Sequence, residues 1–205
     1  DPIHISNVDT VELSYDKRNS VLANDRKQLQ KAAAQNLLYK WAGSLKTKFF
    51  TAGDAREAHT SETATGNRKK ITKAVVMKVA VRFNMDDVPA DGRFMLLDAS
   101  MYMDLLDDLT DKELSAFLAC ADASRGVLGK LYGFEIMQRS QVLRTTADGA
   151  SLLKWESDGA ATELAAGLAW QQDCVSRALG DVKMFDDMGN PTYYGDIYSF
   201  LVRTG

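Results

Sequence analysis

The longest regular pattern of apolar positions runs from residue 16 to residue 45. Its main row of apolar side chains recurs every four residues and consists of Leu29, Ala33, Leu37, Trp41 and Leu45. Residues spaced by four lie above one another on one face of an α-helix. The pattern therefore predicts one long amphipathic helix, roughly 40 Å in length at the standard rise per residue.

The segments on either side of this helix are less regular. Residues 1–14 alternate loosely between β-branched and polar types, which predicts a strand or an extended arm. Residues 51–67 are mostly small and polar, with hardly any apolar anchors. A loop of this length inside a compact domain is uncommon, and it often marks contact with another chain or mobility.

The middle of the chain begins with a helix and a strand. A helix is expected over residues 72–84, because Thr72 is in position for an N-cap and the chain must leave the helix before Pro89. The apolar side chains of its inner face are Val75, Val76, Val79 and Phe83. The apolar run at residues 93–97 then predicts a short buried strand.

Two short helices are expected next. Ser100 can cap a helix over residues 101–108. Thr110 and Glu113 have the spacing of a capping box, which opens a further helix. After three closely spaced glycines, residues 134–143 alternate like a strand.

The last part of the chain ends in a hairpin pattern. Residues 147–159 have the composition of a loop, and residues 164–179 favour a strand followed by a helix. Residues 182–185 and 193–202 flank the turn-rich stretch 186–191, which predicts a β-hairpin.

The order of these elements indicates the α+β class. The first and last segments cannot form a core by themselves, so we expect a discontinuous domain wrapped around an inserted one. The chain has 205 residues, of which 45% are hydrophobic and 26% charged, and only three are prolines. This composition is that of an ordinary globular protein with a substantial core.

Charge and hydropathy exclude several classes of partner. The formal net charge is -3 and the sequence pI is about 5.4, so there is no global attraction for nucleic acid or anionic membranes. No apolar run approaches the ~18 residues needed to cross a bilayer. Cys120 and Cys174 lack the spacing of a zinc or redox motif, and we expect them to be reduced and buried.

The sequence offers little catalytic chemistry. His4 and His59 are the two histidines, and both lie in segments expected to be an arm and a polar loop, which hold a catalytic geometry poorly. A Gly-x-Ser-x-Gly nucleophile elbow is absent. We therefore expect no imidazole-based hydrolytic site.

A basic stretch precedes the helix at residue 72. Residues 64–70 superficially resemble a phosphate loop, but such a loop needs two glycines five positions apart, and here one glycine precedes three cations. The favoured interpretation is a solvated approach to the helix. The alternative is contact with an acidic surface of a neighbouring subunit or with nucleic acid through Arg68, Lys69, Lys70 and Lys73.

Acidic and aromatic clusters leave similar alternatives. The carboxylates between Asp104 and Glu113 are best explained as caps and as helix-dipole partners in first turns. The alternative is a cation held between subunits by this cluster, which consists of Asp104, Asp107, Asp108, Asp111 and Glu113. The tyrosines near the end of the chain favour core packing. Partner contact through Tyr193 and Tyr194 is the alternative, because tyrosines suit interfaces.

Five stretches together resemble major capsid proteins of tailed bacteriophages with the Hong Kong 97-type fold, most closely those of the gut Bacteroidetes-phage branch. The stretches are Ser14-Tyr-Asp-Lys-Arg18, Ala64-Thr-Gly-Asn-Arg-Lys69, Arg93-Phe-Met-Leu-Leu97, Gly129-Lys-Leu-Tyr-Gly-Phe-Glu-Ile136 and Gly189-Asn-Pro-Thr-Tyr-Tyr-Gly-Asp-Ile-Tyr198. None is a catalytic signature, so the resemblance depends on their order and spacing.

The resemblance implies a fold with a long spine helix, a peripheral domain at residues 1–72 and 176–205, and an axial domain at residues 73–175. It implies a structural subunit that assembles in the host cytoplasm into hexamers and pentamers, which tile the icosahedral head of a virion around the genome. The partners are then identical subunits, with scaffold, portal and packaged DNA as further candidates and no membrane. Catalytic residues, cofactors and metals are not expected. Candidate subunit-interface residues are Arg68, Lys69, Lys70, Lys73, Asp107, Asp108, Tyr193 and Tyr194.

Members of this family carry an N-terminal arm and an extended β-loop before the spine helix. Here only the returning end of that loop is expected, so the chain is interpreted as N-terminally truncated. Two other functions stay open. One is the shell of an encapsulin-type cellular cargo compartment, and the other is an enzyme that uses the carboxylates between Asp104 and Glu113.

Overall fold

The protein is described by a computed structural model, and its chain divides into two compact units. The first unit combines residues 1–37 with residues 177–205, and the second consists of residues 38–176. The second unit is therefore inserted between the two segments of the first. The described residues are 3–6, 17–43, 47–58, 60, 67–155, 159–192 and 194–204.

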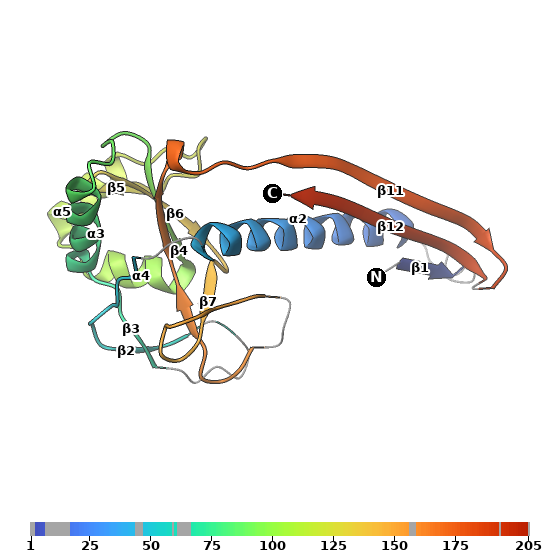
Figure 1. Cartoon of the computed structure of the whole chain (residues 1–205), viewed down its shortest axis with the longest axis horizontal. Coiled ribbons are helices and arrows are strands. Elements are labelled where there is room, and N and C mark those ends of the chain that lie inside the picture. Colours follow the sequence, from blue (N-terminus) through green and yellow to red (C-terminus); the bar gives the residue numbers. More distant parts are fainter. Residues whose placement is uncertain are drawn as a thin grey trace. The chain divides into compact units, whose positions relative to one another are not determined.

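The first unit is built from one sheet and most of one helix. The sheet has the order β1-β12-β11, with every neighbouring pair antiparallel. Its strands are β1 (Ile3–Ser6), β11 (Leu179–Asn190) and β12 (Gly195–Thr204). The predicted hairpin is confirmed, and its strands extend further into the turn than the composition indicated. Figure 1 shows β11 and β12 as this long hairpin.

The long helix predicted over residues 16–45 is present as α2 (Lys17–Gly43), which has 27 residues. The predicted row at Leu29, Ala33 and Leu37 is half-buried. The last turns of α2 belong to the second unit, where Leu38 and Ala42 are buried. The boundary between the two units therefore lies within α2.

A four-stranded sheet forms the centre of the second unit, with the order β10-β4-β6-β5. β4 and β6 are parallel, and the other pairs are antiparallel. Each residue of β4 is buried, which explains its continuous apolar run, because a strand covered on both faces needs no alternation. The strands are β4 (Arg93–Asp98), β5 (Gly129–Leu131), β6 (Phe134–Arg139) and β10 (Leu168–Gln171).

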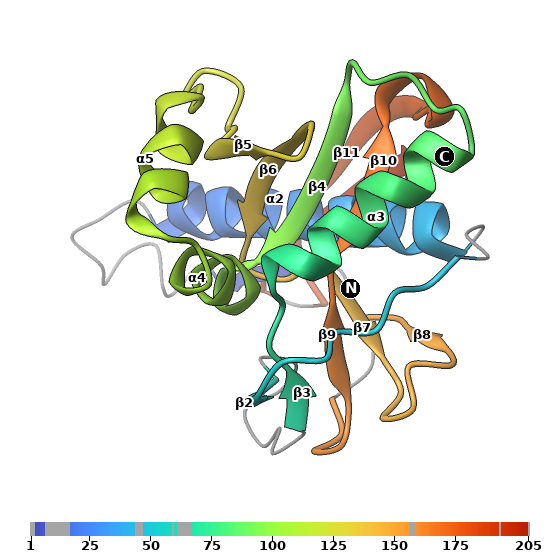
Figure 2. The ribbon, with the colours of Figure 1, turned by 90° about the vertical axis from the view of Figure 1, so that its left-hand side faces the viewer.

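Three helices form the larger core with one face of this sheet (Figure 2). They are α3 (Lys73–Met85), α4 (Ala99–Asp107) and α5 (Asp111–Ala119). Val76 of α3, Leu105 of α4 and Ile136 of β6 are completely buried there. The predicted inner face of α3 is confirmed, since Val75, Val76 and Val79 are buried and Phe83 packs against the same core.

The other face of the sheet packs on a smaller core. Leu96 of β4 and Leu168 of β10 meet Leu38 and Ala42 from the last turns of α2. A second, three-stranded sheet with the order β8-β7-β9 contributes Leu143 to this core. Its strands are β7 (Leu143–Thr145), β8 (Leu152–Leu153) and β9 (Leu164–Ala166).

Several expectations about local structure were wrong. The segment expected to be a loop at residues 51–67 contains β2 (Ala55–Glu57), which pairs with β3 (Asn67–Lys69). Residues 164–179 contain no α-helix. The strand expected first is present as β9 and β10, which pair with β7 and β4, whereas in place of the expected helix there is only the short 3₁₀ helix η1 (Gln172–Cys174) before β11.

The caps and cysteines also differ from expectation. The N-cap of α4 is Asp98, whose carboxylate accepts a hydrogen bond from the backbone N–H of Met101, so Ser100 lies inside the helix. Cys120 and Cys174 are exposed, since each lies at the end of a short helix rather than on its packed face.

The structural division places residues 38–72 in the second unit, whereas the expected domain boundaries lie at residues 72 and 175. Buried Leu38, Ala42 and Ile71 explain this difference, because all three belong to cores of the second unit. The tyrosines of the hairpin region differ in burial. Tyr198 is 1% exposed and Tyr194 is 80% exposed, while Tyr193 and His59 lie outside the described residues.

Candidate functional site

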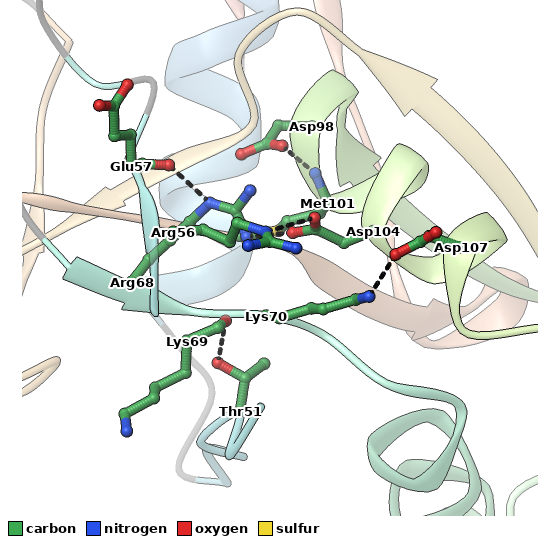
Figure 3. A network of polar contacts seen from close by, with 10 residues as sticks. All are labelled: Thr51, Arg56, Glu57, Arg68, Lys69, Lys70, Asp98, Met101, Asp104 and Asp107. Carbon is green, nitrogen blue, oxygen red and sulfur yellow. Dashed lines mark hydrogen bonds and ion pairs between the residues drawn. The ribbon is translucent and has the colours of Figure 1, made fainter. Parts of the chain in front are cut away.

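Several ion pairs and hydrogen bonds of the second unit lie where Arg56 and residues 68–73 contact α4 and α5. Cations on the incoming segment face carboxylates on the two helices and on the turn between them. Figure 3 shows the part of this set in which Arg68 and Lys70 meet Asp104 and Asp107 of α4. Sequence separations of 35 to 40 residues join most of these partners. We refer to this set of contacts, made by Arg56, Arg68, Lys70 and Lys73 with Asp104, Asp107, Asp108 and Glu113, as the ionic clasp.

Asp104 is the inner carboxylate of the ionic clasp. Arg56 and Arg68 lie directly opposite each other on β2 and β3, so their charges repel. Asp104 compensates both: its carboxylate lies 2.6 Å from Arg68 Nη1 and 3.5 Å from Arg56 Nε. Arg68 Nε also donates to the carbonyl oxygen of Glu57 at 2.9 Å. The Arg68 side chain is 5% exposed, so its charge depends on these acceptors.

Lys70 and Asp107 form the outer pair of the clasp, with 2.6 Å between Nζ and Oδ2. This hydrogen bond raises the pKa of Lys70 above its ordinary value, against the opposing effect of burial. The same bond lowers the pKa of Asp107. Both shifts favour the ionised pair, although the Asp107 side chain is 70% exposed and screened by water.

The start of α3 is held by two acidic residues from the neighbouring helices. Thr72 occupies the N-cap position but makes no side-chain cap, and the backbone N–H of Lys73 instead donates to Asp108 Oδ2 at 2.7 Å. The ammonium group of Lys73 lies 2.8 Å from Glu113 Oε2. Asp108 thus caps a helix that begins far from it in sequence.

Glu113 has two structural roles, since it binds Lys73 of α3 and forms the capping box of α5 with Thr110. Its carboxylate accepts hydrogen bonds from Lys73 and from both the backbone N–H and the hydroxyl of Thr110. These bonds, the one from Lys73 first, lower its pKa from 4.5 to about 2. The predicted capping box at Thr110 is therefore confirmed, and the same glutamate also anchors α3.

The acidic cluster is explained differently from our expectation. Asp111 and Glu113 lie in the first turn of α5, as expected. Asp104 and Asp107 lie in the later part of α4, where the helix dipole does not favour negative charge, and they are held by arginine and lysine partners instead. Among the described residues, no group of three or more His, Cys, Asp or Glu side chains could hold a metal ion.

The structure separates the candidate interface residues into three groups. Arg68, Lys70 and Lys73 have partners within the chain, and so do Asp107 and Asp108. Lys69 and Tyr194 have exposed side chains. Tyr193 lies outside the described residues. Contact of these residues with a neighbouring subunit stays a prediction.

Two sets of exposed apolar side chains were not predicted from the sequence. On α3 the row is formed by Met77, Val81 and Met85, which are 46%, 50% and 73% exposed. On β11 the exposed set is Val182, Met184, Phe185 and Met188. The spacing by four of the α3 row is visible in the sequence, but its exposure is not, because the same helix has a second apolar row that packs inward.

Comparisons with solved structures show the fold. The capsid structure of the cyanophage P-SCSP1u matches with a TM-score of 0.62 and 15% sequence identity, over 100% of this chain and 65% of that one. A structure from Mycobacterium phage Che8 matches with a TM-score of 0.60 and 14% identity, over 100% of this chain and 64% of that one. The asymmetric unit of the mature capsid of bacteriophage PhiM1 matches with a TM-score of 0.53 and 14% identity, over 100% of this chain and 66% of that one.

These matches cover the whole chain, so it has the mixed α and β fold found in phage capsid structures. The chain spans just under two thirds of the length of each of these solved chains. No protein-family model matches the sequence, and no curated protein matches it. No helix in the described part of the chain is long and apolar enough to cross a membrane.

Proposed function

We propose that this protein is a structural subunit of an icosahedral phage head, located in the virion after assembly in the host cytoplasm. The observation that carries the proposal is the match of the complete chain to phage capsid structures at TM-scores up to 0.62. The proposed mechanism is self-assembly into hexamers and pentamers around the genome. Scaffold, portal and packaged DNA are proposed as further partners.

In the proposed subunit, α2 serves as the spine helix of a Hong Kong 97-type fold. The unit formed by residues 1–37 and 177–205 would be the peripheral domain, and residues 38–176 would form the axial domain. The gut Bacteroidetes-phage branch is proposed on the five sequence stretches that resemble its capsid proteins. The division of the chain into a discontinuous unit and an inserted one supports the assignment of a peripheral and an axial domain.

The polar groups of the clasp support a structural role rather than catalysis. A catalytic carboxylate needs access to substrate and a pKa near the working pH. Asp104 instead lies between two arginines, and the pKa of Glu113 is held at about 2 by bonds within the protein. We therefore propose that the protein is not an enzyme and that the clasp fixes the β2–β3 segment to the helices.

The exposed apolar side chains of the protein support a role in assembly. Exposed apolar residues form a row on α3 and a group on β11, and exposed apolar patches mark sites of protein contact. Each contact between subunits can be modest, because symmetry repeats it many times over a closed shell. Lys69, Tyr193 and Tyr194 remain candidates for such contacts, alongside the outer residues of the clasp.

The test is reconstitution of the full-length protein at high concentration, with and without its scaffold, followed by negative-stain electron microscopy. We expect closed shells of uniform size in which this protein is the most abundant component. Monomers alone under both conditions would refute the proposal. Nuclease-protected DNA inside particles isolated from cells would support a phage head, whereas a captured enzyme would favour a cargo compartment.

A further inference from the structure

The outer edge of β11 is the largest unpaired strand surface in the described part of the first unit. β11 has 12 residues and lies at the end of the sheet order β1-β12-β11. Residues 180–189 are all exposed. A long exposed edge presents a row of free N–H and C=O groups that can pair with another strand.

The middle of β11 is regular enough to serve as such a template. Its pairing with β12 continues without interruption from Val182 to Asp187, and register shifts occur only outside this stretch. Lys183, Phe185 and Asp187 alternate along the strand, so their side chains project from the same face of the sheet. All three are exposed, and Phe185 is 55% exposed.

This alternation is self-complementary. When two identical strands pair antiparallel about a two-fold axis, a residue at the centre faces its own copy, and residues at equal distances on either side face each other. With Phe185 at the centre, each Lys183 faces Asp187 of the other copy, and the two Phe185 rings face each other. Opposite charges and aromatic pairs at directly opposed positions stabilise antiparallel sheets.

Neighbouring registers lack this complementarity. A centre at Lys183, Asp186 or Asp187 would place two like charges against each other. A centre at Met184 would oppose Asp181 to Asp187, which again places like charges against each other. The register centred at Phe185 leaves Asp186 opposite Met184, but it brings no like charges together. Among centres from Lys183 to Asp187, the pattern therefore favours Phe185.

We propose that β11 of two copies of this chain pair edge to edge, antiparallel, about a two-fold axis at Phe185. The two three-stranded sheets then form one continuous six-stranded sheet across the pair. The contact deepens the proposed function, because it names one contact between subunits. The contact depends only on β11 and its register with β12, so it can be absent while the shell still assembles.

Disulfide trapping tests the register. In the full chain with C120S and C174S, which replace two exposed thiols, F185C should form a disulfide-linked dimer under mild oxidation, since directly opposed positions in an antiparallel pair come close enough for a disulfide. M184C and V182C are the matched controls on the same strand, and each should cross-link roughly tenfold less. The pair K183C and D187C, mixed as two proteins, should form the heterodimer.

Charge reversal tests the cross-strand pairs without new thiols. Lys183→Asp should weaken dimerisation roughly tenfold in analytical ultracentrifugation, because two like-charge pairs replace two opposite-charge pairs. Adding Asp187→Lys should restore it, which also shows that the strand still folds. Asp181→Lys is the control for net charge, since Asp181 faces a glycine in this register and should leave dimerisation unchanged.

The outcomes separate the contact from the proposed function. Equal cross-linking at all positions, preferential cross-linking of M184C or V182C, or failure of the charge swap to restore pairing would each overturn the proposed contact. Closed shells that form normally with Lys183→Asp would also overturn it while leaving the capsid function intact. Preferential F185C dimers together with rescue by the swap would establish it.

Discussion

The guanidinium group of Arg68 lies 2.6 Å from the carboxylate of Asp104, and their side chains are only 5% and 12% exposed. Arg56, directly opposite Arg68 on the paired strand, approaches the same carboxylate at 3.5 Å. One acidic side chain of α4 therefore neutralises two cations of the β2–β3 segment. The stability of this segment should depend on that residue more than on any outer pair.

We expect Asp104→Asn to destabilise the protein by about 3 kcal/mol, because it leaves a buried arginine without a counter-charge beside a second arginine. Urea unfolding followed by circular dichroism measures the change. Asp107→Asn is the matched control in the same helix. Asp107 is 70% exposed, although its partner Lys70 is only 13% exposed, so this substitution should cost clearly less than Asp104→Asn. Equal effects of the two variants would contradict the central position given to Asp104.

A second prediction concerns acid stability. The pKa of Glu113 is lowered from 4.5 to about 2 in the folded protein. The ionised form therefore contributes stability that is present above the unfolded pKa and is lost as the pH falls toward 2. Glu113→Gln should lower the urea midpoint most at neutral pH, and its difference from the wild type should shrink as the pH drops from 4.5 toward 2.

The control for this experiment is Glu57→Gln, which alters an exposed glutamate of β2. Urea midpoints at about pH 7, 4 and 2.5 span the expected change. A difference between wild type and Glu113→Gln that stayed constant over this range would show that the ionised carboxylate is not its source.

A third prediction tests the contact between α5 and β5. A Cβ atom at Gly129 would lie 2.5 Å from ring atoms of Phe117, which is 1% exposed and cannot move outward without leaving the core. Gly129→Ala should destabilise the protein by about 1–3 kcal/mol through this overlap. Thermal unfolding measures it, and Phe117→Leu in the same chain should recover part of the loss.

Gly43→Ala provides the comparison for this variant. Nothing lies within 4 Å of a Cβ at Gly43, which is the last residue of α2. This substitution should be neutral or slightly stabilising, since alanine favours the helix over glycine. A Gly129→Ala variant as stable as Gly43→Ala would mean that Phe117 has room to adjust.

A fourth prediction compares identical substitutions on opposite faces of α3. Val76 is completely buried and Val81 is 50% exposed. Val76→Ala should cost about 2 kcal/mol, from two buried methyl groups and the cavity they leave. Val81→Ala should be close to neutral, because it removes exposed surface and improves helix propensity. Chemical denaturation of both variants provides the measurement, and similar losses would contradict the assigned faces.

The sequence predicted the elements that have strong local patterns. The row of apolar residues in α2, the inner face of α3 and the uninterrupted apolar run of β4 each depend on neighbours within a few positions. The capping box at Thr110 and Glu113 is local in the same sense. Such features follow from periodicity and caps, and the structure contains each of them.

Features fixed by distant partners could not be predicted. β2 is short, and it is held by pairing with β3 and by the contact of Arg56 with Asp104, so its residues look like a polar loop in the sequence. The cap of α3 comes from Asp108 rather than from the adjacent Thr72. The strand expected at the start of residues 164–179 is present as β9 and β10, which pair with β7 and β4, but the helix expected after it is absent, and the short 3₁₀ helix η1 stands in its place.

The pairing of β1 with β12 sets an order for folding during synthesis. Ile3 lies opposite Tyr198, so β1 leaves the ribosome long before its partner strand has been made. Both hydrophobic cores of the inserted unit consist of residues that precede residue 176, so they can form in the meantime. The sheet that exposes β11 can therefore close only after β12 has been made, when the cores of the inserted unit can already be in place.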